Sequence, residues 1–214
     1  MADKATFPIP PTYAQDTWGC ADYGAGRMGL REWFAGMALQ VIAQYPALQK
    51  PDELDKEAGV AQASYVPDAG HTKLIQLLHA DPRIATTVLT TEEEGVALSA
   101  GAWLGGQRSV LLLQSSGVGN CINMLSLMAT CRFPLLAIVT MRGEWAEFNP
   151  WQMPMGRATP AALELMGVKV MRVDEAEQAA ETVASAATLA FDSDQQIAVL
   201  LSQRMIGRKK WVGK

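Results

Sequence analysis

The feature that most constrains the fold is an alternation of short apolar runs with helical segments. The apolar runs predict strands at 60–66, 84–89, 110–113, 135–140, 168–173 and 197–201. The segments between them predict helices at 72–79, 93–104, 119–130, 160–166 and 174–191, the last capped by Asp174. Continuous apolar strands separated by helices are typical of a mainly parallel sheet with helices on both faces. The pattern therefore predicts a doubly wound α/β fold.

The two ends of the chain differ from this alternation. Residues 1–29 carry prolines and glycines without a clear period and predict an extended N-terminal arm. Residues 30–45 place apolar side chains at helical spacing and predict an added helix. We expect residues 30–214 to form one domain, with a long irregular segment at 142–157.

In a sheet of this kind, ligands bind at the carboxyl ends of the strands. Four segments directly follow predicted strands and are expected to converge there. They are residues 67–71, the acids 92–94, the glycine-containing segment 115–120 and the segment that begins at Arg142.

The three consecutive glutamates, 92–94, have two interpretations. Carboxylates in the first turn of a helix complement its dipole and need no further role. The helix that follows is built largely from glycine, alanine and serine, so a neighbouring helix or chain could approach its backbone closely. A carboxylate buried at such an interface would have a raised pKa, suited to proton exchange near neutral pH.

Gly117 and Gly119 follow a predicted strand and have two interpretations as well. They either form a tight bend or bring backbone amides close to an anion. Ile122 stands where a dinucleotide-binding motif would have its third glycine, and the chain has no P-loop lysine. Simple nucleotide binding is therefore disfavoured.

Together these segments resemble a known family. Residues 65–173 are similar to the pyrimidine-binding domain of thiamine-diphosphate-dependent 2-oxo acid decarboxylases. Within that family they are most similar to the separate α subunits of sulfopyruvate decarboxylase and to phosphonopyruvate decarboxylase. The matching pieces are 66–68, 92–97, 114–120 with Asn123, 142–144 and 155–157.

The resemblance implies a role for one of the glutamates. In this family a glutamate hydrogen-bonds the aminopyrimidine ring of the cofactor and so activates the thiazolium carbon that attacks a 2-oxo acid. The family's acid lies nine residues before a glycine of the following helix, and counting back from Gly101 gives Glu92. Glu93 is the alternative, because a shift of one residue is possible in a run of acids.

Further site residues are expected around Glu92. The resemblance places Gly117, Gly119, Asn120 and Asn123 at the cofactor, although the two asparagines could instead only tie down the turn. Gln114, Ser115 and Arg142 are expected at the substrate, with a solvated side chain as the alternative for Arg142. His71 is either a proton-transfer or orienting group or a surface-loop histidine. Trp145 and Trp151 are interpreted as a partner interface, a lid or core packing.

One half of the cofactor site is missing from the chain. No Gly-Asp-Gly segment of the kind that binds the diphosphate and its metal occurs in the sequence. The resemblance therefore implies thiamine diphosphate with Mg²⁺, a separate β subunit that carries the metal ligands, no metal ligands on this chain, and self-association. The alternatives are a carboligase or lyase with another substrate, or a non-catalytic scaffolding subunit.

Composition excludes several other classes of protein. The formal net charge of −4 and the pI near 5.2 argue against a nucleic-acid partner. No apolar run is long enough to span a bilayer. The chain has three cysteines without metal-like spacing, which predicts reduced thiols and a cytoplasmic location.

Overall fold

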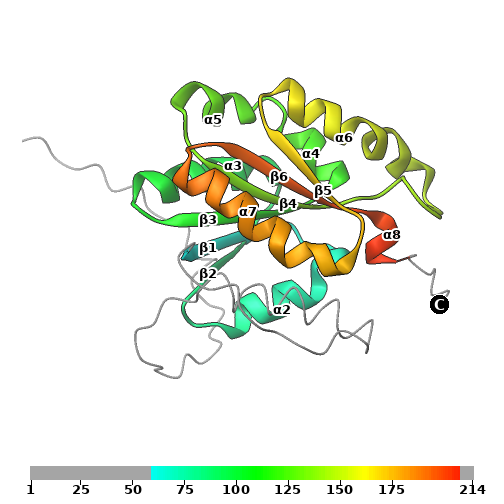
Figure 1. Cartoon of the computed structure of the whole chain (residues 1–214), viewed down its shortest axis with the longest axis horizontal. Helices are drawn as coiled ribbons and strands as arrows, with labels where there is room; N and C mark the ends of the chain where they lie inside the picture. Colours follow the sequence, from blue (N-terminus) through cyan, green and yellow to red (C-terminus); the bar gives the residue numbers. More distant parts are fainter. Residues whose placement is uncertain (1–58, 208–214) are drawn as a thin grey trace, which may run out of the picture.

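The computed structural model describes residues 59–207 of the 214-residue chain (Figure 1). The predicted arm at 1–29 and the predicted helix at 30–45 lie outside the described residues. A single domain over residues 30–214 therefore stays a prediction, whereas the part from residue 59 onward can be compared with the sequence directly.

The described part is built on six parallel strands in the order β2-β1-β3-β4-β6-β5. All six predicted strands are present, with ends shifted by at most two residues. They are β1 Val60–Tyr65, β2 Ala85–Val88, β3 Arg108–Gln114, β4 Leu135–Thr140, β5 Lys169–Val173 and β6 Gln196–Leu201. Every neighbouring pair is parallel, which confirms the predicted sheet.

Helices cover both faces of this sheet. Helices α2 (Thr72–Ala80) and α7 (Ala179–Asp192) pack on one face. The other face carries α3 (Glu92–Leu104), α4 (Ser115–Cys121), α5 (Leu125–Cys131) and α6 (Met153–Leu165). The doubly wound fold is therefore confirmed.

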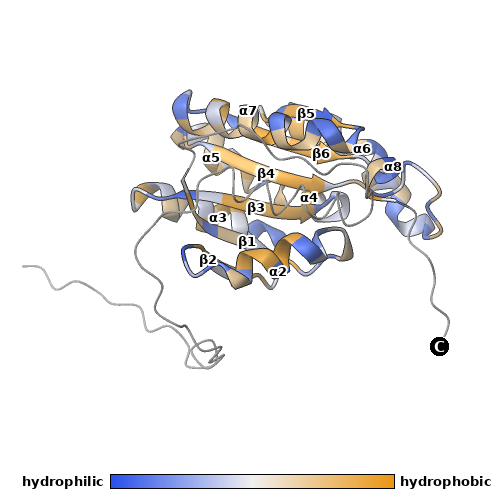
Figure 2. Ribbon diagram, turned by 60° about the horizontal axis from the view of Figure 1, so that its bottom comes forward, coloured by the Kyte–Doolittle hydropathy of each residue, from blue (hydrophilic) through white to orange (hydrophobic). Residues whose placement is uncertain are grey.

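The two central strands supply the core on both sides. Val110 and Leu112 of β3 face α2 and α7, whereas Leu111 and Leu113 face the helices of the other layer. All six residues of β4 are buried, and Figure 2 shows both strands in hydrophobic colours. Each fully buried aliphatic side chain contributes about 1.5 to 3 kcal/mol. The middle of each central strand, 110–113 in β3 and 135–139 in β4, is therefore apolar because neither of its faces meets water.

The small residues of α3 have two different surroundings. A Cβ atom on Gly95 would lie 2.3 Å from Cδ1 of Leu111, so this glycine allows the helix to pack closely on the sheet. A Cβ atom on Gly101 would meet no atom of residues 59–207 within 4 Å. Close packing on the sheet therefore explains Gly95, whereas the described part of the chain leaves the space beside Gly101 open.

Three sequence predictions about the region from α4 to α6 were wrong. The helix expected at 119–130 is two short helices, α4 and α5, interrupted at residues 122–124. Gly117 and Gly119 lie inside α4 rather than in a turn, because the helix begins directly after β3 at Ser115. The irregular segment ends early: a 3-10 helix, η3 (Pro150–Gln152), leads into α6 at Met153.

Asp174 does not cap the last long helix. Its carboxylate is paired with Arg172, 3.0 Å away, and a 3-10 helix, η4 (Ala176–Gln178), precedes α7. The chain then continues through β6 into the short helix α8 (Gln203–Ile206). Among the helices of residues 59–207, none combines the length and apolar character needed to cross a membrane.

Candidate functional site

The site predicted from the sequence lies at the carboxyl edge of the sheet, where the strand order changes direction. Strands β1 and β3 are neighbours, but the chain leaves β1 toward β2 on one side and returns to β3 on the other. Ligands of doubly wound sheets bind at such a switch point. A 3-10 helix, η2 (Ala69–His71), follows β1, and α4 follows β3, so both segments meet at this point.

Glu92 rests directly on α4. Its Oε2 accepts a hydrogen bond of 2.8 Å from Nδ2 of Asn120. A Cβ atom on Gly117 would lie 2.4 Å from Oε1 of Glu92 and 2.5 Å from its Cδ and Cγ. Gly117 and Asn120 are three residues apart and therefore lie on the same face of α4. The absence of a side chain at residue 117 creates the space that the Glu92 side chain occupies.

The two neighbouring glutamates are held differently. The Glu93 carboxylate accepts a hydrogen bond from the hydroxyl of Thr91, and this bond lowers the pKa of Glu93. The Glu94 carboxylate accepts a bond of 2.8 Å from the backbone N–H of Thr90. Both bonds are local to the start of α3, which is the behaviour of ordinary helix-start acids. Of the three acids, Glu92 alone bonds a side chain of α4.

A second group of polar side chains, centred on Asp68, links the ends of three strands. Asp68 follows β1, and its carboxylate accepts bonds from Nε2 of Gln114 at 2.6 Å, Oγ1 of Thr140 at 2.7 Å and the Gly70 N–H at 3.0 Å. Asp68 was not selected from the sequence as a site residue. A carboxylate three residues past the end of β1, at the switch point, was the signal available for it.

His71 is buried close to the Asp68 carboxylate and the end of β3. Only 1% of the residue is exposed, and its Nε2 is 3.1 Å from the carbonyl oxygen of Leu113. Burial lowers the pKa of His71, while the Asp68 carboxylate and backbone hydrogen bonds act in the opposite direction. The surface-loop interpretation is therefore wrong, since the ring is covered by protein at the carboxyl end of β3.

Gln114 and Ser115 are oriented by the same surroundings. Gln114 donates to Asp68 through Nε2 and accepts a bond of 2.8 Å from the Ser116 hydroxyl through Oε1. Ser115 is buried, and its Oγ accepts a bond of 3.1 Å from the backbone N–H of Arg142. Gln114 thus lies in the polar group, whereas Ser115 ties α4 to the segment after β4.

Arg142 forms a paired cation rather than a solvated one. Its Nε and Nη2 each donate to the Glu147 carboxylate at 2.6 Å. The side chains are 11% and 1% exposed, respectively. The hydrogen bonds from Arg142 lower the pKa of Glu147 to about 2, helped by donors from Asn149, Gln203 and Gly143. The positive charge of Arg142 is therefore neutralised within the chain.

The other two residues predicted at the cofactor lie outside this group. A Cβ atom on Gly119 would be 3.3 Å from the sulfur of Met155, so this glycine serves the packing of α4 on α6. Asn123 is exposed in the break between α4 and α5. The structure thus brings Glu92, Gly117 and Asn120 together, and sets Gln114 with Asp68 and His71 next to them.

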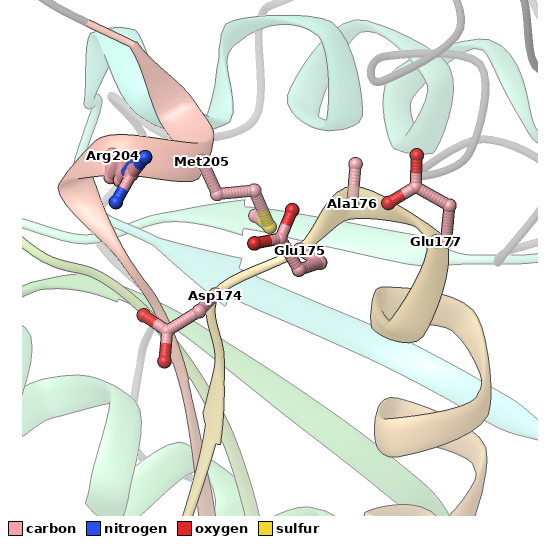
Figure 3. A pocket seen from close by; sticks show the side chains of 6 residues that line it. All are labelled: Asp174, Glu175, Ala176, Glu177, Arg204 and Met205. Atoms are coloured by element: carbon pink, nitrogen blue, oxygen red, sulfur yellow. The ribbon is translucent and has the colours of Figure 1, made fainter.

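A pocket lies farther along the same edge, at the ends of β5 and β6. It has a volume of about 200 Å³ (Figure 3). The segment between β5 and α7 contributes the acids, and α8 contributes a cation and a thioether; the lining residues are Asp174, Glu175, Ala176, Glu177, Arg204 and Met205. None of the site residues predicted from the sequence lines it. Within residues 59–207, no group of three or more His, Cys, Asp or Glu side chains is placed to hold a metal ion.

Comparison with known proteins gives the family. No protein-family model matches the chain. The sulfopyruvate decarboxylase subunit alpha of Methanothermobacter thermautotrophicus is 34% identical over 147 residues, which are 68% of this chain and 89% of that protein. The chain belongs to the sulfopyruvate decarboxylase alpha-subunit family.

Longer relatives match in part. The sulfopyruvate decarboxylase of Methanosarcina acetivorans is 36% identical over 132 residues, which are 61% of this chain and 33% of that protein. The phosphonopyruvate decarboxylase of Streptomyces viridochromogenes is 39% identical over 109 residues, 50% of this chain and 28% of that protein. These matches confirm the resemblance seen in the sequence.

Solved structures share the fold. A 2-oxoglutarate:ferredoxin oxidoreductase from Magnetococcus marinus has a TM-score of 0.60 at 14% identity, over 87% of this chain and 34% of that chain. A putative thiamin diphosphate-dependent enzyme from Mycobacterium smegmatis has a TM-score of 0.56 at 14% identity, over 88% of this chain and 33% of that chain. In both, the chain corresponds to about a third of a longer protein.

Proposed function

We propose that this chain is the pyrimidine-binding subunit of a thiamine-diphosphate-dependent decarboxylase that acts on a small 2-oxo acid such as sulfopyruvate or phosphonopyruvate. The observation that carries the proposal is the position of the Glu92 side chain, which packs on Gly117 and bonds Asn120 of α4 at the switch point of the sheet. The reactions named for the relatives support decarboxylation. The designation of the Methanothermobacter relative as an alpha subunit supports a partner chain.

The residues around Glu92 fit the aminopyrimidine ring of the cofactor. One carboxylate oxygen, Oε2, is engaged by Asn120, whereas Oε1 lies over Gly117 and accepts no hydrogen bond from residues 59–207. A carboxylate with one committed and one available oxygen can bond a ring nitrogen and exchange a proton with it. When bound, thiamine diphosphate supplies the nucleophilic carbon and takes up the electrons released on decarboxylation.

Each neighbouring residue has a proposed part in this site. Asn120 holds one oxygen of Glu92 in place, and Gly117 leaves room for the other. Gln114 presents its amide from the end of β3 and is the residue that we place nearest the substrate. His71 is covered, so its proposed role is to orient the end of β3 through the Leu113 carbonyl.

The ion pair of Arg142 affects how the substrate would be bound. Because Glu147 neutralises this arginine, Arg142 offers little net charge to a sulfonate, phosphonate or carboxylate group. Neutral donors of this chain, such as Gln114, and cations of the partner chain are therefore proposed to hold the acidic groups of the substrate.

The proposal includes a separate β subunit. That chain would carry the diphosphate-binding domain and the Mg²⁺ ligands, and the assembly would include more than one copy of each chain. We place the complex in the cytoplasm, in line with the free thiols of Cys121 and Cys131. Neither nucleic acid nor membrane has a part in the proposal.

Co-expression of this chain with the β chain tests the proposed function. The purified complex is assayed on a panel of 2-oxo acids with thiamine diphosphate and Mg²⁺, with and without an added aldehyde acceptor. We expect release of carbon dioxide from at least one acid, and loss of that release in Glu92→Gln. Carbon–carbon bond formation as the main reaction would instead identify a carboligase, and an inactive complex would favour a scaffolding subunit.

Cofactor binding provides a second readout. Calorimetric titration of the chain alone should show weak binding of thiamine diphosphate, with high affinity appearing only when the β chain and Mg²⁺ are present. The reason is that the diphosphate and its metal contribute much of the binding, and the sequence of this chain has no Gly-Asp-Gly segment for them. Tight, metal-dependent binding to the chain alone would contradict the divided site.

A further inference from the structure

The segment between β4 and α6 carries exposed apolar side chains next to the candidate site. Trp145 is 46% exposed, Trp151 is 83% exposed and Met153, the first residue of α6, is 36% exposed. We call these three residues the loop surface. Core packing, one of the interpretations of the tryptophans, is therefore wrong for the chain by itself. Tryptophan is the residue type most enriched among those that dominate binding at protein interfaces.

The loop surface is held in place from within. The buried Glu147 carboxylate accepts bonds from the Arg142 guanidinium, from the Asn149 N–H at 2.9 Å and from Nε2 of Gln203 at 2.8 Å. Oε1 of Gln203, on α8, accepts bonds of 3.0 Å from the backbone N–H groups of Glu144 and Trp145. A segment anchored in this way loses little conformational entropy when another protein binds it.

Close backbone contacts fix the base of the same segment. Gly143 has a φ of +76°. A Cβ atom there would lie 2.6 Å from the carbonyl oxygen of Gln152. A Cβ atom on Gly156 would lie 2.0 Å from the carbonyl oxygen of Arg142. The side chain of Asn149 accepts a bond of 3.1 Å from the Trp151 N–H, which sets the start of η3. The tryptophans are thus exposed although their backbone is firmly tied.

The segment that carries the loop surface contacts α4, the helix on which the Glu92 side chain packs. Arg142 donates its backbone N–H to Ser115, the first residue of α4. Gly119 of α4 packs against Met155 of α6, two residues after the loop surface ends. Figure 1 shows the β4–α6 segment and α8 together at the carboxyl-end side of the sheet. A protein bound over the loop surface would therefore also reach the carboxyl edge that holds Glu92.

The length of the relatives indicates which protein would bind there. The chain corresponds to 33% of the Methanosarcina sulfopyruvate decarboxylase, so most of that protein has no counterpart in the matched region. The chain also lacks the Gly-Asp-Gly segment. Under the proposed function the cofactor would bind Glu92 and the diphosphate-binding chain at once, so that chain would lie against the carboxyl edge.

We propose that the loop surface of Trp145, Trp151 and Met153 is the docking site for the separate chain that carries the diphosphate-binding domain. This inference rests on the proposed function and adds the surface through which the two chains join. A second copy of the present chain is the competing occupant, and it would leave the cofactor site without its diphosphate half.

Site-specific photo-crosslinking in the cells that produce the chain tests the proposal. The photoreactive residue p-benzoylphenylalanine is placed at position 151 and, as a matched control, at position 165. Leu165 is 84% exposed and ends α6, the helix at whose start the loop surface lies. We expect position 151, and not position 165, to capture a chain whose peptides include a Gly-Asp-Gly segment. Capture of only a second copy of this chain at 151 would overturn the proposal, as would capture of the diphosphate chain at 165 alone.

Matched substitutions give an independent readout in the full chain. Trp151→Ser should reduce the amount of the diphosphate chain that co-purifies with the tagged protein by roughly 10-fold or more, whereas Leu165→Ser should leave it unchanged. Circular dichroism of both variants checks that they are folded. Equal co-purification with both variants overturns the docking site but leaves the proposed function standing. If the unmodified tagged chain co-purifies with no diphosphate chain, the proposed function fails as well.

Discussion

Glu92 and Glu147 are both carboxylates at the carboxyl edge of one sheet, but the protein holds them in opposite ways. Glu147 is 1% exposed and accepts hydrogen bonds from Arg142, Gly143, Asn149 and Gln203. Glu92 is half-buried and accepts one hydrogen bond from residues 59–207, donated by Asn120, while its other oxygen lies over a glycine. A carboxylate surrounded by donors is fixed in its charged form, whereas one with an available oxygen can exchange a proton.

The two carboxylates therefore have different roles, one in stabilising the fold and one in the candidate site. The Glu147 group ties together the β4–α6 segment and α8, and so supports a surface. Around Glu92, one carboxylate oxygen accepts no hydrogen bond from residues 59–207, at the switch point where the fold predicts a ligand. Changes at Glu147 should therefore affect folding stability, and changes at Glu92 should affect turnover.

Replacement of the Glu92 carboxylate is expected to have the largest effect. In the assembled enzyme, Glu92→Gln should lower turnover by roughly 10² to 10⁴, because the amide cannot exchange a proton. The urea midpoint of the variant should stay close to that of the unmodified chain, since Glu92 is half-buried and keeps a partner in Asn120. Normal turnover in this variant would show that the Glu92 carboxylate has no part in the reaction.

Filling the space beneath Glu92 should have the next largest effect. Gly117→Ala places a methyl group 2.4 Å from Oε1 of Glu92 in the present geometry, so the carboxylate must move. A displacement of about 1 Å can cost on the order of 10² in rate. Gly119→Ala is the matched control on the same helix, because its methyl group would meet only the flexible end of Met155 at 3.3 Å. Equal losses in the two variants would contradict a specific seat for Glu92.

Glu147→Gln should act on stability. The substitution leaves the Arg142 cation without its counter-charge, and we expect a loss of about 2 kcal/mol in the free energy of unfolding. This value is below that of fully buried pairs because Arg142 keeps 11% of its side chain exposed. Urea titration of the chain alone measures it. An unchanged midpoint would show that the pair does not stabilise the loop.

The dependence of folding stability on pH is a second test of the Glu147–Arg142 pair. The pKa of Glu147 is lowered to about 2 in the folded chain, below its ordinary value of 4.5. A lowered folded-state pKa gives a stabilisation that is present above the unfolded-state value and is lost as the pH falls toward 2. The unmodified chain should therefore lose more stability between pH 5 and pH 2 than Glu147→Gln does. Parallel stability curves for the two proteins would contradict the assignment.

The smallest effect is expected at the end of the acidic run. Glu94 bonds the Thr90 N–H at the start of α3, and Glu94→Gln should cost about 0.3 to 1 kcal/mol of stability with little change in turnover. Thermal unfolding and the decarboxylase assay measure the two quantities. A loss of turnover comparable with that of Glu92→Gln would remove the distinction between the acids.

The sequence predicted the sheet well because its central strands are buried on both faces and so contain runs of apolar residues. Strand β4 was predicted with its observed ends, since all six of its residues are buried. The helices around α4 and α6 were predicted less well. Glycines at 117 and 119 resemble a turn in sequence, but they serve contacts with Glu92 and Met155 that only the folded chain brings together.

The site was predicted in part for a similar reason. Residues at the ends of strands, such as Gln114, can be assigned to the carboxyl edge from the strand pattern alone. The partners of each side chain cannot. Glu147 lies five residues after Arg142 in an irregular segment, and Asp68 meets Thr140 across 72 positions of sequence, so neither pairing has a periodic signal.

The role of Glu92 is tested most directly by the exchange of the proton on the reactive carbon of bound thiamine diphosphate for deuterium, measured by NMR after acid quench. The measurement compares Glu92→Gln with Glu93→Gln in the complex with the β chain. We expect slow exchange in Glu92→Gln and near-normal exchange in Glu93→Gln, because of the two glutamates only Glu92 bonds a side chain of α4. Normal exchange in Glu92→Gln would show that Glu92 does not activate the cofactor.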